Sequence, residues 1–109
     1  MIGGGDDGMR KVRESSVEKY LVRRCEERGW RCLKFDPKFC RGMPDRMIVL
    51  PEGRVAWAEL KTDGGELSAS QKYRMAWLRN QGHDVHVVWS KEQADEVIAE
   101  LERPQRDRA

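Results

Sequence analysis

The 109 residues predict a single α/β domain, because segments of helical and of strand character alternate along most of the chain. Three segments carry apolar residues at helical spacing, and four shorter runs of strand-like residues lie among them. Each helical segment follows a serine suited to capping it, and a Glu or Gln stands three residues later. The predicted order of elements is α-β-β-β-α-β-α.

The predicted elements account for residues 15–103, which we interpret as the folded domain. Helices are expected over 16–28, 69–80 and 91–103, and strands over about 30–35, 45–50, 54–61 and 84–89. The polar, partly glycine-rich segment 1–14 is expected to be flexible, and residues 104–109 to form a loose tail.

Composition restricts the class of protein. Charged residues make up 37% of the chain, and no apolar run approaches the roughly 18 residues that a membrane span needs. We therefore expect a soluble, cytoplasmic protein with no membrane partner. The three cysteines lack metal-site spacing, so free thiols are expected. They are Cys25, Cys32 and Cys40.

The charge is unevenly distributed although its net value is only +2. Basic residues, mostly Arg, concentrate before residue 47, and acidic residues gather between 92 and 102. A basic first half favours phosphate binding, whereas a solvated helix face of mixed charge is the simpler alternative. The side chains expected to contact DNA are Lys38, Arg41, Arg46 and Lys72.

The stretch 42–61 carries the polar residues that a buried hairpin would not ordinarily hold. Leu50-Pro51-Glu52-Gly53 suits a type I turn followed by a glycine bulge, which pairs Leu50 with Arg54. Counting back from that pair places Asp45 opposite Glu59 on one face of the sheet. A two-residue loop would instead put these two carboxylates on opposite faces.

Asp45, Glu59 and Lys61 together suit metal-dependent hydrolysis of a phosphodiester. Two carboxylates and the backbone carbonyl of Leu60 are oxygen ligands of the kind that Mg²⁺ and Mn²⁺ prefer. Lys61 can orient or deprotonate the attacking water, or stabilise charge on the phosphate. The alternative is a surface aspartate and an exposed Glu–Lys pair on an edge strand.

Glu18 and Gln71 each allow two interpretations. Both occupy the third position of a predicted helix, where a side chain can complete a capping box. Helical geometry also turns both residues inward, so either could join the site. The helix over 69–80 has a second apolar stripe, which could face another subunit or simply be buried. That stripe is formed by Ala69, Tyr73, Ala76 and Trp77.

The motifs resemble those of the VRR-NUC domain, the virus-type replication-repair nuclease branch of the PD-(D/E)XK superfamily. The matching segments are GMPDRMIVL, WAELK and GGELSASQKYRMAWLRNQGHDVHVVWS, within a similarity that spans roughly Ser16 to Leu101. The resemblance implies a restriction-endonuclease-like αβββαβ core with a mixed sheet flanked by helices, plus an extra C-terminal helix.

The resemblance also implies a function. It implies a Mg²⁺- or Mn²⁺-dependent DNA endonuclease in which Asp45 and Glu59 ligate the metal and Lys61 is catalytic. Glu18, as a ligand acting directly or through water, and Gln71 would complete the site. Stand-alone members are similar to Holliday-junction resolvases, so a homodimer acting on branched DNA is expected, with no organic cofactor. A less selective nickase or restriction-type nuclease, and a DNA-binding module with a vestigial site, are the alternatives.

Overall fold

The computed structural model describes residues 15–36, 38, 40–62 and 64–104, and within them the predicted order of elements is confirmed. The predicted segment 1–14 and all but Pro104 of the predicted tail lie outside the described residues. The elements are α2 (Ser16–Glu27), β1 (Arg31–Lys34), β2 (Arg46–Val49), β3 (Val55–Leu60), α3 (Ala69–Asn80), β4 (Asp84–Val88) and α4 (Lys91–Glu102).

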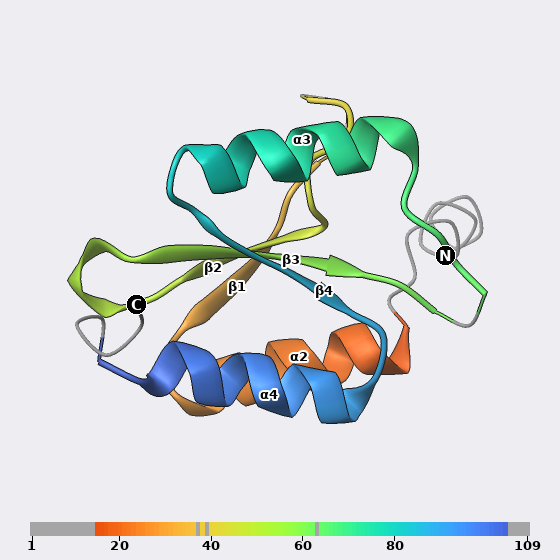
Figure 1. Cartoon of the computed structure of the whole chain (residues 1–109). Helices are drawn as coiled ribbons and strands as arrows, with labels where there is room; N and C mark the ends of the chain where they lie inside the picture. The colour runs from red at the N-terminus through yellow and green to blue at the C-terminus, as the bar shows by residue number, and fades with distance from the viewer. Residues whose placement is uncertain (1–14, 37, 39, 63, 105–109) are drawn as a thin grey trace, which may run out of the picture.

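The four strands form one mixed sheet in the order β1-β2-β3-β4. The pairs β1–β2 and β2–β3 are antiparallel, and β4 runs parallel to β3. Figure 1 shows α3 on one face of the sheet and α2 with α4 on the other. The α/β architecture with a mixed sheet between helices is therefore as expected.

The register of the central hairpin is also confirmed. Arg46 pairs with Ala58 and Val49 with Val55, which places Asp45 opposite Glu59 one step further along. The Leu50 N–H donates to the Arg54 carbonyl at 2.9 Å, so Leu50 and Arg54 close the hairpin as predicted.

The turn itself differs from the type I turn that we predicted. Glu52 has a φ of 64° and Gly53 a φ of 74°, and the Arg54 N–H donates to the Pro51 carbonyl at 3.3 Å. Positive φ at two successive turn residues is characteristic of the type I′ turn, whose twist matches that of the flanking strands. The register is unaffected because three residues still separate Leu50 from Arg54.

Alternation along the strands divides the apolar residues between two cores. Ile48, Ala56 and Ala58 pack towards α2 and α4, whereas Trp57 packs with Met75 and Leu78 of α3. The same alternation places Asp45 and Glu59 on the α3 side of the sheet. Asp45 and Glu59 therefore lie between the hairpin and the first turn of α3, whereas Glu18 belongs to α2.

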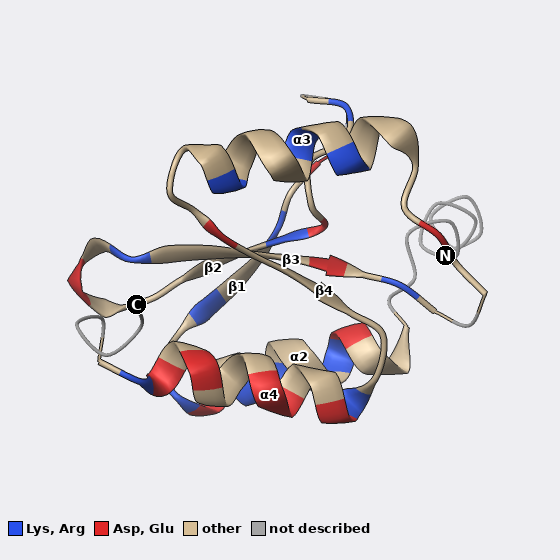
Figure 2. Cartoon of the chain, viewed as in Figure 1, with Lys and Arg blue, Asp and Glu red and all other residues tan. Residues whose placement is uncertain are grey.

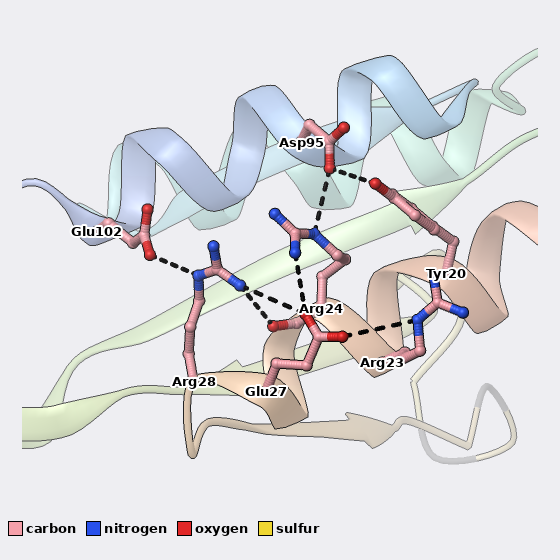
Figure 3. A network of polar contacts seen from close by, with 7 residues as sticks. All are labelled: Tyr20, Arg23, Arg24, Glu27, Arg28, Asp95 and Glu102. Atoms are coloured by element: carbon pink, nitrogen blue, oxygen red, sulfur yellow. Dashed lines mark hydrogen bonds and ion pairs between the residues drawn. The ribbon is translucent and has the colours of Figure 1, made fainter.

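A polar network joins α2 to α4 and includes three arginines of the basic first half of the chain (Figure 3). Arg24 Nε lies 3.3 Å from Asp95 Oδ1, and Arg28 pairs with Glu102. The Tyr20 hydroxyl donates to Asp95 at 2.7 Å. These α2 arginines thus pair with carboxylates of α4, as the mixed-charge alternative anticipated.

No helix among the described residues is long and apolar enough to cross a membrane. All three cysteines are free, as expected.

Candidate active site

Asp45 is fixed directly before β2 by two backbone hydrogen bonds. Its Oδ2 accepts from the Leu60 N–H at 2.9 Å, and its backbone carbonyl accepts from the Phe35 N–H at 2.9 Å. The side chain of Asp45 therefore links the start of β2 to the end of β3. Because the N–H and C=O of one strand residue point to the same side, the Leu60 carbonyl also faces the Asp45 side of β3.

Glu59 is buried, with only 2% of its surface exposed, yet its carboxylate is only partly satisfied. Oε2 accepts from Gln71 Nε2 at 2.9 Å and lies 3.5 Å from Lys61 Nζ. Oε1 is buried and has no hydrogen-bond partner among the described residues. An unpartnered buried carboxylate oxygen costs free energy that a bound cation would recover.

The carboxyl groups of Asp45 and Glu59 both resist ionisation in the absence of a cation. Burial raises the pKa of Glu59 to about 7, and the neighbouring Asp45 carboxylate adds to the effect while Lys61 opposes it. Burial also raises the pKa of Asp45, although the Leu60 N–H acts in the opposite direction. A buried and a half-buried acid with raised pKa values in one place are typical of a functional site.

This donor set fits a hard divalent cation. No group of three or more His, Cys, Asp or Glu residues suited to a metal occurs in the described part of the chain. The ligands that the protein would supply are the carboxylates of Asp45 and Glu59 and the Leu60 carbonyl. Mg²⁺ characteristically takes few protein ligands and keeps several waters, so such an open oxygen site suits it.

Gln71 caps α3 and also contacts Glu59. Its Oε1 accepts from the Ser68 N–H at 2.8 Å and the Ser68 hydroxyl accepts from the Gln71 N–H, which completes the capping box of α3. The amide Nε2 of the same side chain holds Glu59 at 2.9 Å. Capping therefore orients Gln71 towards the carboxylate pair.

Glu18 lies near the site but is held by cations of its own. Ser15 caps α2 as predicted, whereas the Glu18 carboxylate accepts from Arg46 Nε at 2.8 Å and lies 3.5 Å from Lys34 Nζ. It therefore does not reach back to complete a capping box. The Glu18 charge still contributes to raising the pKa of Asp45.

Arg46, which we expected to contact DNA, is instead buried, with 5% of its surface exposed. Its guanidinium also donates to the Cys32 carbonyl at 3.1 Å. The two-residue period of β2 explains the difference, because it directs Arg46 to the face opposite Asp45. Lys34 also lies near the site, which the sequence did not predict. It is brought there because it pairs with Arg46 across β1 and β2.

The other three residues expected to bind DNA are exposed. Lys38 and Arg41 lie in the loop between β1 and β2, and Lys72 lies in the first turn of α3. Figure 2 shows basic residues on α3 and on the loop beside it, whereas acidic residues crowd α4. Position and charge are thus compatible with a phosphate backbone on the α3 side.

The second apolar stripe of α3 is exposed, so the described residues do not bury this helix on both sides. Only Met75 and Leu78 are buried, whereas Tyr73 is 68% and Trp77 43% exposed.

Comparisons with known proteins agree with this geometry. No family model matches the chain. The chain is 37% identical to "Putative nuclease p44" of Acyrthosiphon pisum secondary endosymbiont phage 1. The alignment spans 84 residues, which are 77% of this chain and 90% of that protein. A solved structure described as a VRR_NUC domain superposes with a TM-score of 0.70 at 30% identity, covering 76% of this chain and 90% of that one.

The mixed sheet and its carboxylate pair, taken with these relatives, define an α/β nuclease. Within that class the chain belongs to the VRR-NUC family, as the motifs indicated.

Proposed function

We propose that this protein is a Mg²⁺- or Mn²⁺-dependent endonuclease that hydrolyses phosphodiester bonds of DNA. The observation that carries the proposal is the unpartnered, buried Oε1 of Glu59, next to Asp45 and on the same strand face as Lys61. A site built only to stabilise the fold would satisfy that oxygen.

Each residue of the site has a defined part in this proposal. Asp45, Glu59 and the Leu60 carbonyl would hold the cation, which acidifies a water and neutralises charge on the phosphate when bound. Gln71 orients Glu59 through its 2.9 Å hydrogen bond. Lys61, half-buried beside Glu59, is placed to orient or deprotonate the attacking water or to stabilise the phosphate.

The finer proposal is that the enzyme acts on branched DNA as a homodimer. Support comes from the resemblance to junction resolvases and from apolar residues left open on the α3 side of the sheet. Leu33 and Val49 are diagonal neighbours there, 39% and 38% exposed, and apolar surface of this kind suits a second copy. A less selective nickase or restriction-type nuclease would need no dimer, and a vestigial DNA-binding module would need no metal.

A cleavage panel distinguishes these proposals. A four-way junction, flap, splayed arm, linear duplex and single strand are each incubated with Mg²⁺, Mn²⁺ or EDTA. Asp45→Asn and Lys61→Ala should each lose about 10²-fold or more of the metal-dependent rate. Glu96→Gln, which removes an exposed carboxylate of α4, should cleave like the wild type. Unchanged cleavage by Asp45→Asn would refute the site.

Two physical measurements accompany the panel. Mn²⁺ should raise the melting temperature of the wild type but not that of Asp45→Asn, because binding only to the folded state stabilises it. Sedimentation at micromolar concentration tests the homodimer, and a monomer that still nicks DNA would favour the nickase.

A further inference from the structure

The outer surface of α3 carries two aromatic side chains that the fold does not use. Tyr73 and Trp77 are one helical turn apart, and they are the two most exposed large apolar residues of the described chain, at 68% and 43%. The buried face of the same helix is formed by Met75 and Leu78, on a different side. Exposed aromatic pairs of this kind mark binding surfaces.

Arg74 joins the two rings into one surface. Its guanidinium carbon lies 5.6 Å from the centroid of the Tyr73 ring and 5.3 Å from that of Trp77, within cation–π range of both. Its Nε is buried without a hydrogen-bond partner among the described residues. The Arg74 side chain is further confined by the backbone at Gly42, where a Cβ atom would approach Arg74 Cβ to 3.3 Å. The cation thus lies within interaction range of both aromatic rings.

The charge of α3 decides between possible occupants of this surface. Residues 69–80 contain three basic side chains and no acidic one. The basic residues are Lys72, Arg74 and Arg79. A second copy packed on this face about a two-fold axis would bring cations against cations with no carboxylate on either helix to pair them. A polyanion with flat, stackable groups satisfies both the charge and the rings.

We propose that Tyr73, Arg74 and Trp77 form a stacking surface for unpaired nucleobases of the DNA substrate. The inference rests on the proposed function, and it adds a reason for preferring branched or single-stranded regions. Every base has a π-face, so aromatic side chains bind unpaired strands with little sequence preference, whereas paired bases in a duplex are stacked on one another. Gln71, two residues before Tyr73, contacts Glu59, so the surface lies on the helix that borders the active site.

The test compares strands of equal charge with and without bases. Fluorescence anisotropy in EDTA measures binding of a duplex bearing a single-stranded arm, and of the same duplex with an abasic arm. The wild type should bind the arm with bases about tenfold or more tighter, the range expected for stacking on one or two rings. Tyr73→Ala and Trp77→Ala should each lose most of this difference. Trp89→Ala is the matched control, because Trp89 is 39% exposed at the end of β4.

Quenching of intrinsic fluorescence supplies a second readout. Trp77 should be quenched by a single strand, so Trp77→Phe should remove that quenching while Trp89→Phe retains it. The inference would be overturned if the wild type bound both arms with equal affinity. It would also be overturned if Tyr73→Ala and Trp77→Ala still preferred the arm with bases as strongly as the wild type does. A dimeric wild type that Trp77→Ala converts to a monomer would overturn it as well, because the occupant would then be a second copy. If the wild type cleaved no DNA substrate at all, the proposed function would be refuted instead.

Discussion

At Glu59, burial and function oppose each other. The folded chain holds this carboxylate almost without solvent and leaves one oxygen unpaired, so the metal-free protein accommodates the charge poorly. Burial raises the pKa from an ordinary 4.5 to about 7. Between these two pH values the folded state retains a proton that the unfolded chain has lost, so the stability of the metal-free protein falls as pH rises from about 4.5 to about 7.

Glu59→Gln should therefore stabilise the metal-free protein while abolishing cleavage. The neutral amide carries no charge to bury, and its oxygen can still accept from Gln71. Denaturation in EDTA at pH 8 should show a gain of about 1–3 kcal/mol, and the gain should shrink towards pH 5. In Mn²⁺ the order should reverse, because only the wild type gains binding energy. A variant less stable than the wild type at pH 8 would contradict this account.

The two functions of Gln71 can be separated by comparing it with its capping partner. Ser68→Ala removes only the helix cap and should cost about 1 kcal/mol of stability. Gln71→Ala removes the other half of the capping box, its bond to the Ser68 N–H, together with the contact with Glu59. It should therefore cost similar stability and also lower kcat about tenfold or more. Both variants are compared by urea denaturation and by initial rates at a temperature where each is folded. Equal kcat values would show that Gln71 acts only as a cap.

Among the side-chain contacts of the site, sequence patterns predicted the one between Ser68 and Gln71 and missed the one between Glu18 and Arg46. Ser68 and Gln71 are three residues apart, so their contact follows from helical geometry. The contact of Glu18 with Arg46 joins residues 28 positions apart, and only the packing of α2 against the sheet reveals it. Arg46 was predicted to contact DNA from its charge and its place in the basic half of the chain, which do not show the face of the strand that it occupies.

At the scale of elements, the hairpin 45–60 shows which features of a turn determine function. Loop length set the register, and with it the meeting of Asp45 and Glu59, so the prediction survived an incorrect turn type. The turn type was missed because a left-handed Glu52 is not a preferred choice, as Asn or Gly would be. Residues of both flanking strands pack in the two cores, and this packing holds the turn although Glu52 is not a preferred residue for it.

The loop before β2 approaches α3 so closely that only glycine fits at position 42. Gly42 has a φ of 86°, and a Cβ there would lie 2.4 Å from the Ser70 carbonyl oxygen. Gly42→Ala should therefore cost about 2–4 kcal/mol, from backbone strain and overpacking together. It should also lower activity, because the displaced loop leads directly into Asp45.

Gly29→Ala is the matched control for this prediction. Gly29 has a similar φ of 78°, but a Cβ there meets nothing within 4 Å. Its cost should be limited to about 1–2 kcal/mol of backbone strain, with cleavage unchanged. Both costs are read from urea denaturation, and equal losses at the two glycines would show that the approach to Ser70 is unimportant.

At the scale of the whole molecule, the sheet separates two electrostatic environments. On one side, Arg24 of α2 and Arg28 directly after it pair with carboxylates of α4. On the other, α3 and the loop before β2 carry exposed cations without acidic neighbours on the helix (Figure 2). A net charge of +2 therefore understates the positive potential next to the carboxylate pair.

This separation predicts that the position of a cation, and not the total charge, sets DNA affinity. Arg41→Gln and Arg23→Gln each remove one exposed positive charge, but Arg41 lies in the loop beside α3 whereas Arg23 lies on α2 near Glu27. If phosphates bind on the α3 side, Arg41→Gln should weaken binding several-fold at about 0.1 M salt and reduce the slope of log K against log[salt] by about one. Arg23→Gln should leave both quantities unchanged, because each exposed charge is screened beyond about 10 Å at that salt concentration. Titrations over a range of salt concentrations in EDTA measure the slopes, and an equal effect of the two substitutions would mean that the DNA does not distinguish the two faces.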